Sequence, residues 1–272
     1  MKDRWPRPTR IACIVDALVN HPYQVFNLGD FARDLKVARS TISEDVAMIR
    51  EAFARTESGV IETLPGASGG VRLKPRPSPQ QMRSITETLL EQLQDPDRIL
   101  PGGFLYMTDI IFSPRWAAVI GTYFSHLFGS LRPDYVVTIE TKGIPLALMT
   151  ARDLDRPLVL IRRNSRVTEG SSVSINYVSG SSSRIQTMSL PRRALPPGSS
   201  VVVIDDFMRG GGTVKGVCDL LAEFEAEVLG IGVVAVTTSP RSKLVEEYES
   251  LAEVTFSPDG RNVQVRCLAH PD

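Results

Sequence analysis

A short run of apolar residues followed by two carboxylates and a glycine-rich loop is the segment with the clearest chemical potential. Val201 to Ile204 are four apolar residues, typical of a buried parallel strand. The chain then reads Asp205, Asp206, Phe207, Met208, Arg209, Gly210, Gly211, Gly212 and Thr213. We expect the two carboxylates where the strand emerges at its C-terminal edge, the usual ligand-binding edge of such sheets.

The loop leads directly into a predicted helix that starts at Gly212, so unhindered backbone N–H groups and the positive end of the helix dipole face one point. That arrangement suits a phosphate, while carboxylates accept hydrogen bonds from sugar hydroxyls. A plain strand-to-helix turn with a solvated acidic tip is the alternative interpretation. The complete order of strand, acid pair, glycine loop, threonine and helix favours a site for a phosphorylated sugar. No Gly-Lys-Ser/Thr follows the spacing of a Walker loop.

A second polar loop follows another strand pattern. Thr141, Lys142 and Gly143 come directly after Tyr135 to Glu140. Taken alone, Lys-Gly after a strand is most simply an ordinary turn.

The part of the chain around these loops alternates between strand and helix patterns. Helices are predicted over 80–94, 116–128, 145–153 and 212–227, and strands over 135–140, 158–163, 200–204 and 228–236. Apolar strands that alternate with helices imply an α/β fold with a mostly parallel sheet flanked by helices. The Ser- and Gly-rich stretch 164–190 contains the short alternating pieces Val173 to Val178 and Ile185 to Leu190, which predict a projecting β-arm.

The N-terminal part has a different pattern. Helical stripes occupy 9–20, 28–35 and 40–54, with Ser40 or Thr41 as the expected N-cap of the third helix and Glu44 in its first turn. Strand patterns at 59–64 and 70–74 flank a glycine-rich turn and predict a hairpin. Three helices followed by a hairpin predict a winged helix-turn-helix. Three prolines between Lys74 and Pro79 predict a connector, so we expect domains at 1–74 and 75–272.

In a winged helix the third helix enters the major groove of double-stranded DNA. Candidate DNA-contacting residues are therefore Arg39, Ser40, Thr41 and Ser43 on the helix and Arg72 and Lys74 on the wing. A solvated helix face is an equally good interpretation for any one of them. Up to Ser78 the chain has twelve Lys and Arg against nine Asp and Glu, an excess of three that is compatible with phosphate contacts.

The segment 201–213 resembles the signature of type I phosphoribosyltransferases for phosphoribosyl pyrophosphate (PRPP). The resemblance implies that Asp205 and Asp206 contact the ribose hydroxyls and that Arg209 to Thr213 bind the 5-phosphate. It further implies that Thr141, Lys142 and Gly143 bind pyrophosphate. One departure is Gly210, where many active members have a threonine.

Together with the arm 166–190, the N-terminal domain and the stretch Leu100 to Asp109, these residues resemble the bacterial purine operon repressor family over about residues 10 to 255. The resemblance implies a homodimeric repressor of purine biosynthesis and related genes, which releases its DNA operator when PRPP binds. It also implies a phosphoribosyltransferase fold that acts as a sensor and not as an enzyme, and guanosine tetraphosphate-type alarmones as competing ligands. Tyr106 and Phe207 are expected near the site, where a packing role is at least as plausible for both.

Two other functions stay open at this point. An active purine phosphoribosyltransferase would need a general base, and position 209, an aspartate in some purine-salvage enzymes of this fold, is arginine here. A constitutive DNA-binding factor would need no intact phosphate loop.

No apolar run is long enough to cross a bilayer, no signal-like segment follows Met1, and the three cysteines have no zinc-like spacing. We therefore expect a cytoplasmic protein that contacts no membrane and holds no metal or cofactor of its own. The sequence leaves open whether Mg²⁺ accompanies PRPP.

Overall fold

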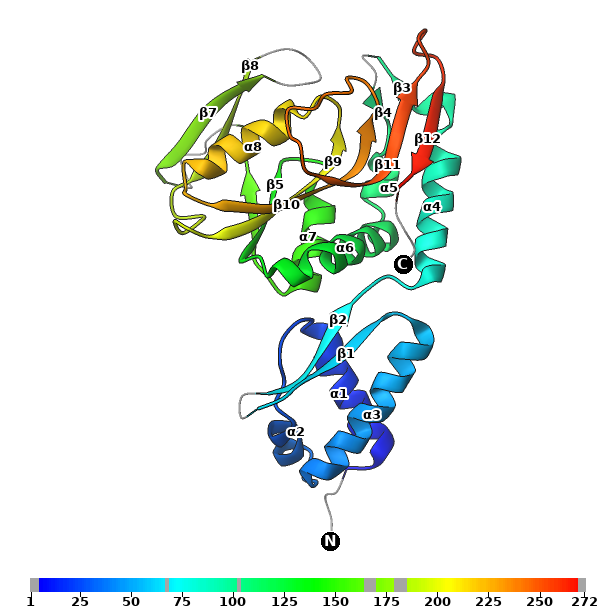
Figure 1. The fold of residues 1–272 in the computed structure, drawn as a ribbon, viewed down its shortest axis with the longest axis vertical. Helices are drawn as coiled ribbons and strands as arrows, with labels where there is room; N and C mark the ends of the chain where they lie inside the picture. The colour runs from blue at the N-terminus through cyan, green and yellow to red at the C-terminus, as the bar shows by residue number, and fades with distance from the viewer. Residues whose placement is uncertain (1–4, 67–68, 102–103, 164–169, 179–184, 269–272) are drawn as a thin grey trace.

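The computed structural model describes residues 5–66, 69–101, 104–163, 170–178 and 185–268. Two compact bodies follow one another along the chain, joined by the short connection between β2 and α4 (Figure 1). The first contains its own core, which includes Ile14, Leu18, Ile42 and Val71.

The N-terminal body is a winged helix-turn-helix. Its elements are α1 (Arg7–Asn20), α2 (Leu28–Asp34), α3 (Arg39–Thr56), β1 (Gly59–Leu64) and β2 (Gly70–Pro75), and the two strands pair antiparallel. Alternate strand residues such as Ile61 and Leu73 point into the core beneath the hairpin. The predicted arrangement of three helices and a wing is confirmed.

The third helix begins earlier than predicted. Ala38, and not Ser40 or Thr41, is its N-cap residue, and the Ile42 N–H donates to the Ala38 carbonyl at 3.3 Å. Lys36, with φ of 53°, makes the left-handed turn before the helix. Because the turn ends two residues sooner than the capping pattern suggested, Ser40 and Thr41 lie in the first helical turn. Their hydroxyls have no hydrogen-bond partner among the described residues.

A buried ion pair joins the first and third helices. The Arg10 guanidinium donates to both carboxylate oxygens of Asp45, at 2.7 and 3.1 Å, and neither side chain is more than 5% exposed. Arg7 approaches the same carboxylate at 3.2 Å. This pair fixes the start of α1 against the middle of the helix that is expected to contact DNA.

The C-terminal body is built on a six-stranded sheet with the order β12-β11-β10-β9-β5-β6. Its strands are β5 (Tyr135–Ile139), β6 (Leu158–Ile161), β9 (Ser200–Met208), β10 (Glu227–Thr237), β11 (Glu249–Phe256) and β12 (Val263–Cys267). Only β12 runs antiparallel to its neighbour, so the sheet is mostly parallel, as predicted.

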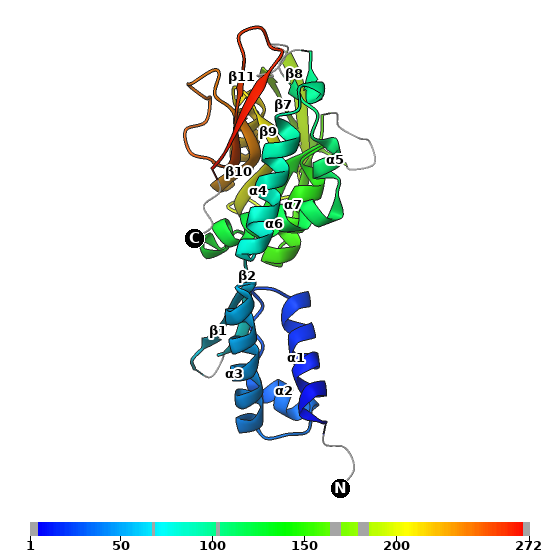
Figure 2. The ribbon, with the colours of Figure 1, turned by 90° about the vertical axis from the view of Figure 1, so that its right-hand side faces the viewer.

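Helices cover both faces of the sheet (Figures 1 and 2). The helices on one face or at the sheet edge are α4 (Pro79–Leu93), α5 (Thr108–Ile111), α6 (Pro114–Phe128) and α7 (Ile144–Leu154). The other face carries α8 (Gly212–Ala222) and the hairpin of β7 (Ser172–Val178) and β8 (Ile185–Pro191). Short pieces complete the chain: η1 (Pro96–Arg98), β3 (Ile99–Leu100), β4 (Phe104–Leu105) and η2 (Gly129–Leu131).

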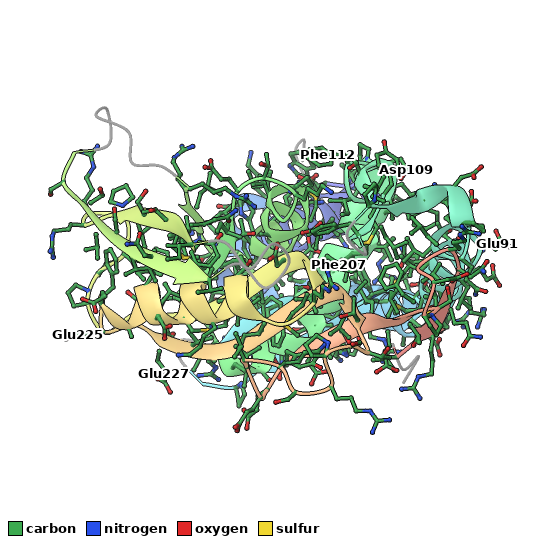
Figure 3. The ribbon with its side chains drawn as sticks, turned by 90° about the horizontal axis from the view of Figure 1, so that it is seen from above. Glu91, Asp109, Phe112, Phe207, Glu225 and Glu227 are labelled. Atoms are coloured by element: carbon green, nitrogen blue, oxygen red, sulfur yellow. The ribbon has the colours of Figure 1, made fainter. Side chains whose placement is uncertain are left out.

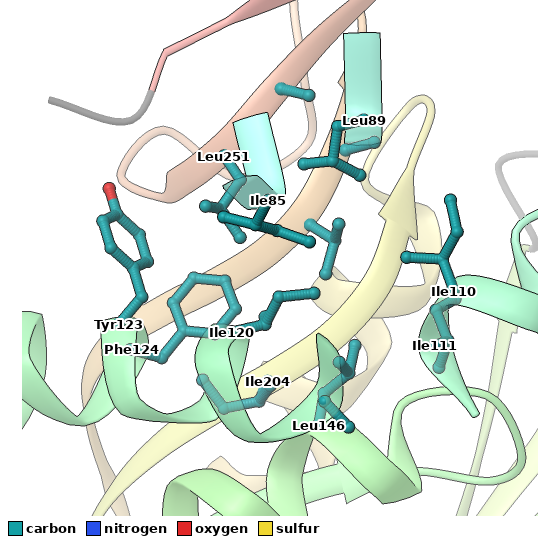
Figure 4. Close-up of a cluster of buried hydrophobic side chains, with 14 of the residues drawn as sticks. Ile85, Leu89, Ile110, Ile111, Ile120, Tyr123, Phe124, Leu146, Ile204 and Leu251 are labelled. Carbon is teal, nitrogen blue, oxygen red and sulfur yellow. The ribbon is translucent and has the colours of Figure 1, made fainter. Parts of the chain in front are cut away.

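The larger core lies between the sheet and the helices α4 to α7. Ile85 and Leu89 of α4, Phe124 of α6 and Ile204 of β9 meet there (Figure 4). Each of these side chains is at most 1% exposed. The strand that leads into the acid pair is thus held by packing on both of its faces, since Val201 and Val203 lie in the core on the α8 side.

Several boundaries differ from the predictions. The last predicted helix was too long: α8 ends at Ala222, where Glu225 adopts φ of 55° and the Ala226 N–H closes onto the Leu221 carbonyl at 3.1 Å. Strands β11 and β12 were missed. Their charged outward residues, together with the place of β12 at the sheet edge, give a weaker apolar pattern than the central strands have.

Candidate functional site

A pocket of about 400 Å³ opens at the carboxyl end of the central strands. It is lined by Phe104, Leu105, Ile139, Glu140, Thr141, Lys142, Arg163, Asp205, Asp206, Phe207, Met208, Arg209, Gly210, Gly211, Gly212, Thr213 and Val214. Two loops that lie about seventy residues apart in the sequence therefore form one site, because β5 and β9 are adjacent and parallel. Figure 3 shows Phe207 at this end of the sheet, well separated from Glu227.

The acid pair lies within strand β9, where the sequence predicted that the strand would already have ended. Asp205 pairs with Val233 of β10 and Phe207 pairs with Ala235, so β10 extends β9 to Met208. Pairing with β5 on the other side stops at Val203. The strand is thus continuous toward β10 and open toward β5, and both carboxylates line the pocket.

The environment of the carboxylates opposes their charge. Burial, and then the charge of Asp206, raises the pKa of Asp205 well above its usual range, and Asp205 is only 8% exposed. Burial likewise raises the pKa of Asp206, while the positive charge of Lys142 partly opposes that shift. Asp205 accepts one hydrogen bond, from the Asp206 N–H at 2.9 Å. Two carboxyl groups in this environment suit a ligand with hydroxyl groups. Hydrogen bonds donated by those hydroxyls would replace the water that the carboxylate oxygens have lost.

The glycine loop supplies the opposite chemistry. Gly211 has φ of 82°, a left-handed conformation that favours glycine, and it is the N-cap of α8. The N–H groups of Gly210 and Gly211 have no acceptor among the described residues. Unpaired N–H groups at the start of an eleven-residue helix are suited to bind an anion.

The second loop packs tightly beneath the carboxylates. A Cβ at Gly143 would lie 2.3 Å from Thr138 Oγ1 and 3.1 Å from Asp205 Oδ1. Thr138 Oγ1 is buried and has no hydrogen-bond partner in the described chain. Glu140 fixes the start of this loop, because it accepts from the Arg163 N–H at 2.7 Å and lies 3.6 Å from the Arg162 guanidinium. Thr141 and Lys142 line the pocket, with Gly143 behind them.

Sequence reasoning missed some pocket residues. Arg163 follows β6 and faces the pocket, where its charge acts on Asp205. It could have been found, because the carboxyl ends of adjacent parallel strands meet at one edge. Phe104 and Leu105 also line the pocket; they lie in the stretch Leu100 to Asp109 but were not predicted as site residues.

Tyr177, which the sequence did not single out, lies outside the pocket lining but contacts Thr213, which is part of it. Its ring packs over Gly216 of α8, and its hydroxyl contacts Thr213 and Gln186.

The prediction for Tyr106 is not supported by this geometry. Tyr106 is absent from the pocket lining and 44% exposed, and its ring lies 5.8 Å from the Arg98 guanidinium. Phe104 and Leu105 line the pocket in its place. The predicted arm is present as β7 and β8, whereas its parts at 164–169 and 179–184 lie outside the described residues.

The residues predicted to contact DNA divide into two groups. Arg39, Ser40 and Ser43 are exposed at the start of α3, and Arg39 has no ion-pair partner among the described residues. Thr41 is half-buried, and Ser43 donates to the Arg39 carbonyl at 3.2 Å. This end of the helix points away from the C-terminal body (Figure 1), which leaves it accessible to a duplex.

The two wing cations are already paired. Glu62 accepts from Arg72 at 2.6 Å and from Lys74 at 3.2 Å. Partial burial alone would raise the pKa of Glu62, but these two hydrogen bonds lower it. Arg72 and Lys74 therefore offer DNA a partly neutralised surface, and Arg39 is the better candidate for a phosphate contact.

Two further observations concern metal sites and membrane spans. Within the ranges that the structure describes, no three His, Cys, Asp or Glu residues are grouped as a metal site would require. None of the helices there has the length and apolar character needed to span a membrane.

Comparison with known families matches both bodies. Residues 6–75 match the family "Bacterial purine repressor, N-terminal", and residues 107–270 match "Phosphoribosyl transferase domain". The second match alone spans more than half of the chain.

Full-length relatives and solved structures agree with these matches. The chain is 44% identical over 264 residues to the purine biosynthesis transcriptional repressor PurR of Bacillus subtilis, covering 97% of this chain and 93% of the relative. It is 38% identical to the purine biosynthesis transcriptional activator PurR of Lactococcus lactis, covering 91% and 92%. The C-terminal fold is similar to adenine phosphoribosyltransferase from Thermoanaerobacter pseudethanolicus, with TM-score 0.54 and 19% identity over 63% of this chain and 99% of that one.

Proposed function

Because the chain belongs to the bacterial purine repressor family, we propose that it is a DNA-binding transcriptional regulator of purine biosynthesis genes whose C-terminal domain senses PRPP. The observation that carries this proposal is the pocket in which an acid pair faces a glycine loop with free N–H groups. The ribose hydroxyls of PRPP suit the acid pair, and its 5-phosphate suits the glycine loop. Lys142 and Arg163, which also line the pocket, suit the pyrophosphate group of PRPP.

The pocket offers binding groups but no evident proton-transfer group. Its carboxyls are Glu140, Asp205 and Asp206; Glu140 is committed to holding its loop, and the other two face the expected ribose. Arg209 stands where a base-contacting aspartate is found in some enzymes of this fold. The C-terminal domain therefore acts as a sensor. The alternative function is an active purine phosphoribosyltransferase with a DNA-binding domain.

A continuous series of contacts links the pocket to the DNA-binding domain. Helix α7 begins directly after the loop 141–143, and it crosses α6 so closely that a Cβ at Gly121 would lie 2.4 Å from Met149. About one turn further along α6, the Tyr23 hydroxyl of the winged helix donates to the Ser125 carbonyl at 3.1 Å. These contacts connect the two bodies physically, and we propose that PRPP binding acts through them to lower DNA affinity. A tenfold effect requires about 1.4 kcal/mol of differential binding.

The test is fluorescence anisotropy of a labelled purine-operon control fragment titrated with the protein, with and without PRPP. Asp205→Ala is expected to bind DNA but to lose the response to PRPP. Glu227→Ala is the matched control, because Glu227 is exposed and pairs with Ser200 at the opposite end of the same strands. Tight DNA binding that ignores PRPP in the unmodified protein contradicts the sensor, and nucleotide formation from PRPP and a purine base supports the enzyme.

The same assay has two further arms, and two separate experiments complete the test. A guanosine tetraphosphate-type alarmone is expected to compete with PRPP for the pocket, and the titration with and without Mg²⁺ shows whether the ion accompanies PRPP. Size-exclusion chromatography with light scattering tests the homodimer that we expect for paired half-sites. A reporter gene decides between repression and activation, since the relatives include both. The proposal places the protein in the cytoplasm, where it meets DNA and PRPP.

A further inference from the structure

The segment that follows β10 crosses the back of the phosphate-binding loop. This segment, residues 239–248, is called the strap below. The Leu244 N–H donates to the Gly210 carbonyl at 3.0 Å, and a Cβ at Gly211 would lie 3.2 Å from the Leu244 nitrogen. The strap is therefore in direct contact with the two glycines whose N–H groups are free.

One side chain of the strap uses all of its donors on backbone carbonyls. Lys243 Nζ lies 2.6 Å from the carbonyl oxygens of Arg209, Thr237 and Pro240. An ammonium has three N–H donors, so these contacts saturate it. They join the phosphate loop, the end of β10 and the strap itself. No carboxylate of the described chain forms an ion pair with Lys243.

Peptide planarity gives these contacts a consequence on the other side of the loop. In a trans peptide the C=O and the following N–H point in opposite directions. Lys243 holds the Arg209 carbonyl toward the strap, so the Gly210 N–H points away from it. The Leu244 N–H holds the Gly210 carbonyl in the same way, so the Gly211 N–H points away too.

The side opposite the strap is the pocket. Residues 209–213 line the pocket, and none of the described residues 239–248 does. Two successive N–H groups are thereby directed at the place where an anion would lie. The Lys243 charge behind the loop adds to the positive potential there.

We propose that Lys243 is a positioning residue that orients the peptide groups of the phosphate-binding loop for the 5-phosphate. The inference rests on the proposed function, since it assigns a role within the same ligand site. It goes beyond the loop motif because Lys243 lies about thirty residues further along the chain and does not line the pocket.

The test is isothermal titration calorimetry of PRPP, ribose 5-phosphate and inorganic pyrophosphate against four full-length proteins: the unmodified chain, Lys243→Met, Lys243→Arg and Arg241→Met. Arg241 is the matched control, because it is an exposed cation of the same strap with no bonding partner among the described residues. We expect Lys243→Met to weaken ribose 5-phosphate and PRPP by about tenfold or more, the usual effect of losing a residue that orients a binding group. Pyrophosphate affinity, and DNA affinity without PRPP, should stay unchanged.

Lys243→Arg separates charge from geometry. Its planar guanidinium cannot direct three donors at converging carbonyls, so it too should lose ribose 5-phosphate affinity. Binding by Lys243→Arg equal to the unmodified protein, an equal loss in Arg241→Met, or an equal loss of pyrophosphate affinity in Lys243→Met would each overturn the positioning role. Unchanged binding by Lys243→Met would overturn it as well. Failure of the unmodified protein to bind PRPP or ribose 5-phosphate instead overturns the proposed function.

Discussion

A single methyl group at Gly143 is predicted to disable the ligand site while leaving DNA binding intact. The Gly143→Ala change places a Cβ 2.3 Å from Thr138 Oγ1, 3.1 Å from Asp205 Oδ1 and 3.2 Å from the Ile204 carbonyl. Real Cβ atoms essentially never come closer than 3.0 Å to a heavy atom outside their own residue and its chain neighbours. The backbone angle itself is not the obstacle, because Gly143 has φ of −65°.

The size of the effect follows from what must move. Thr138 is fully buried on β5, and the Ile204 carbonyl is part of β9, so neither yields easily. Overpacking of this kind costs about 1–3 kcal/mol. If the loop 141–143 shifts to relieve it, Lys142 moves away from the pocket, and a binding loss of about 1.4 kcal/mol raises the PRPP dissociation constant about tenfold.

The assay combines calorimetry with PRPP, DNA anisotropy and urea unfolding. Gly143→Ala should bind the operator normally without PRPP, respond weakly to PRPP, and unfold at lower urea. Thr138→Ala together with Gly143→Ala removes the closest contact and should recover part of the affinity, with Thr138→Ala alone as control. A Gly143→Ala protein with unchanged PRPP affinity and unchanged unfolding midpoint would refute the steric reasoning.

Three further predictions test other parts of the molecule. Burial raises the folded-state pKa of Asp205 above its unfolded value, so its contribution to stability is present at low pH and is lost as pH rises through the folded pKa. Asp205→Asn should flatten this pH dependence of the unfolding free energy in urea. An unmodified protein without the pH dependence contradicts the assignment. Arg10→Met leaves the buried Asp45 carboxylate short of its main partner and should cost about 3–5 kcal/mol of unfolding free energy; a loss below about 1 kcal/mol argues against the pair as a structural element. Arg39→Gln should weaken operator and random DNA alike and reduce the salt dependence of binding by about one unit of slope; an unchanged slope means that Arg39 contacts no phosphate.

Most of the local elements and the glycine-loop motif could be predicted from the sequence. Apolar runs such as Val201 to Ile204 identify central strands because both faces of a parallel sheet are buried. The order of Asp205, Asp206 and the glycine loop requires a strand, a turn and a helix in sequence, which is local information. The winged helix could likewise be predicted, since its helices and hairpin follow one another along the chain.

Contacts between distant residues became visible only in the folded chain. Pairing with β10 keeps Asp205 inside a strand that its own sequence would have ended, and the absence of β5 pairing beyond Val203 opens it to the pocket. Glu62 neutralises wing cations that the sequence presented as free, and Lys243 reaches a loop about thirty residues away. Such contacts depend on strand order and on side-chain packing between distant segments, which no pattern within a window of the sequence contains.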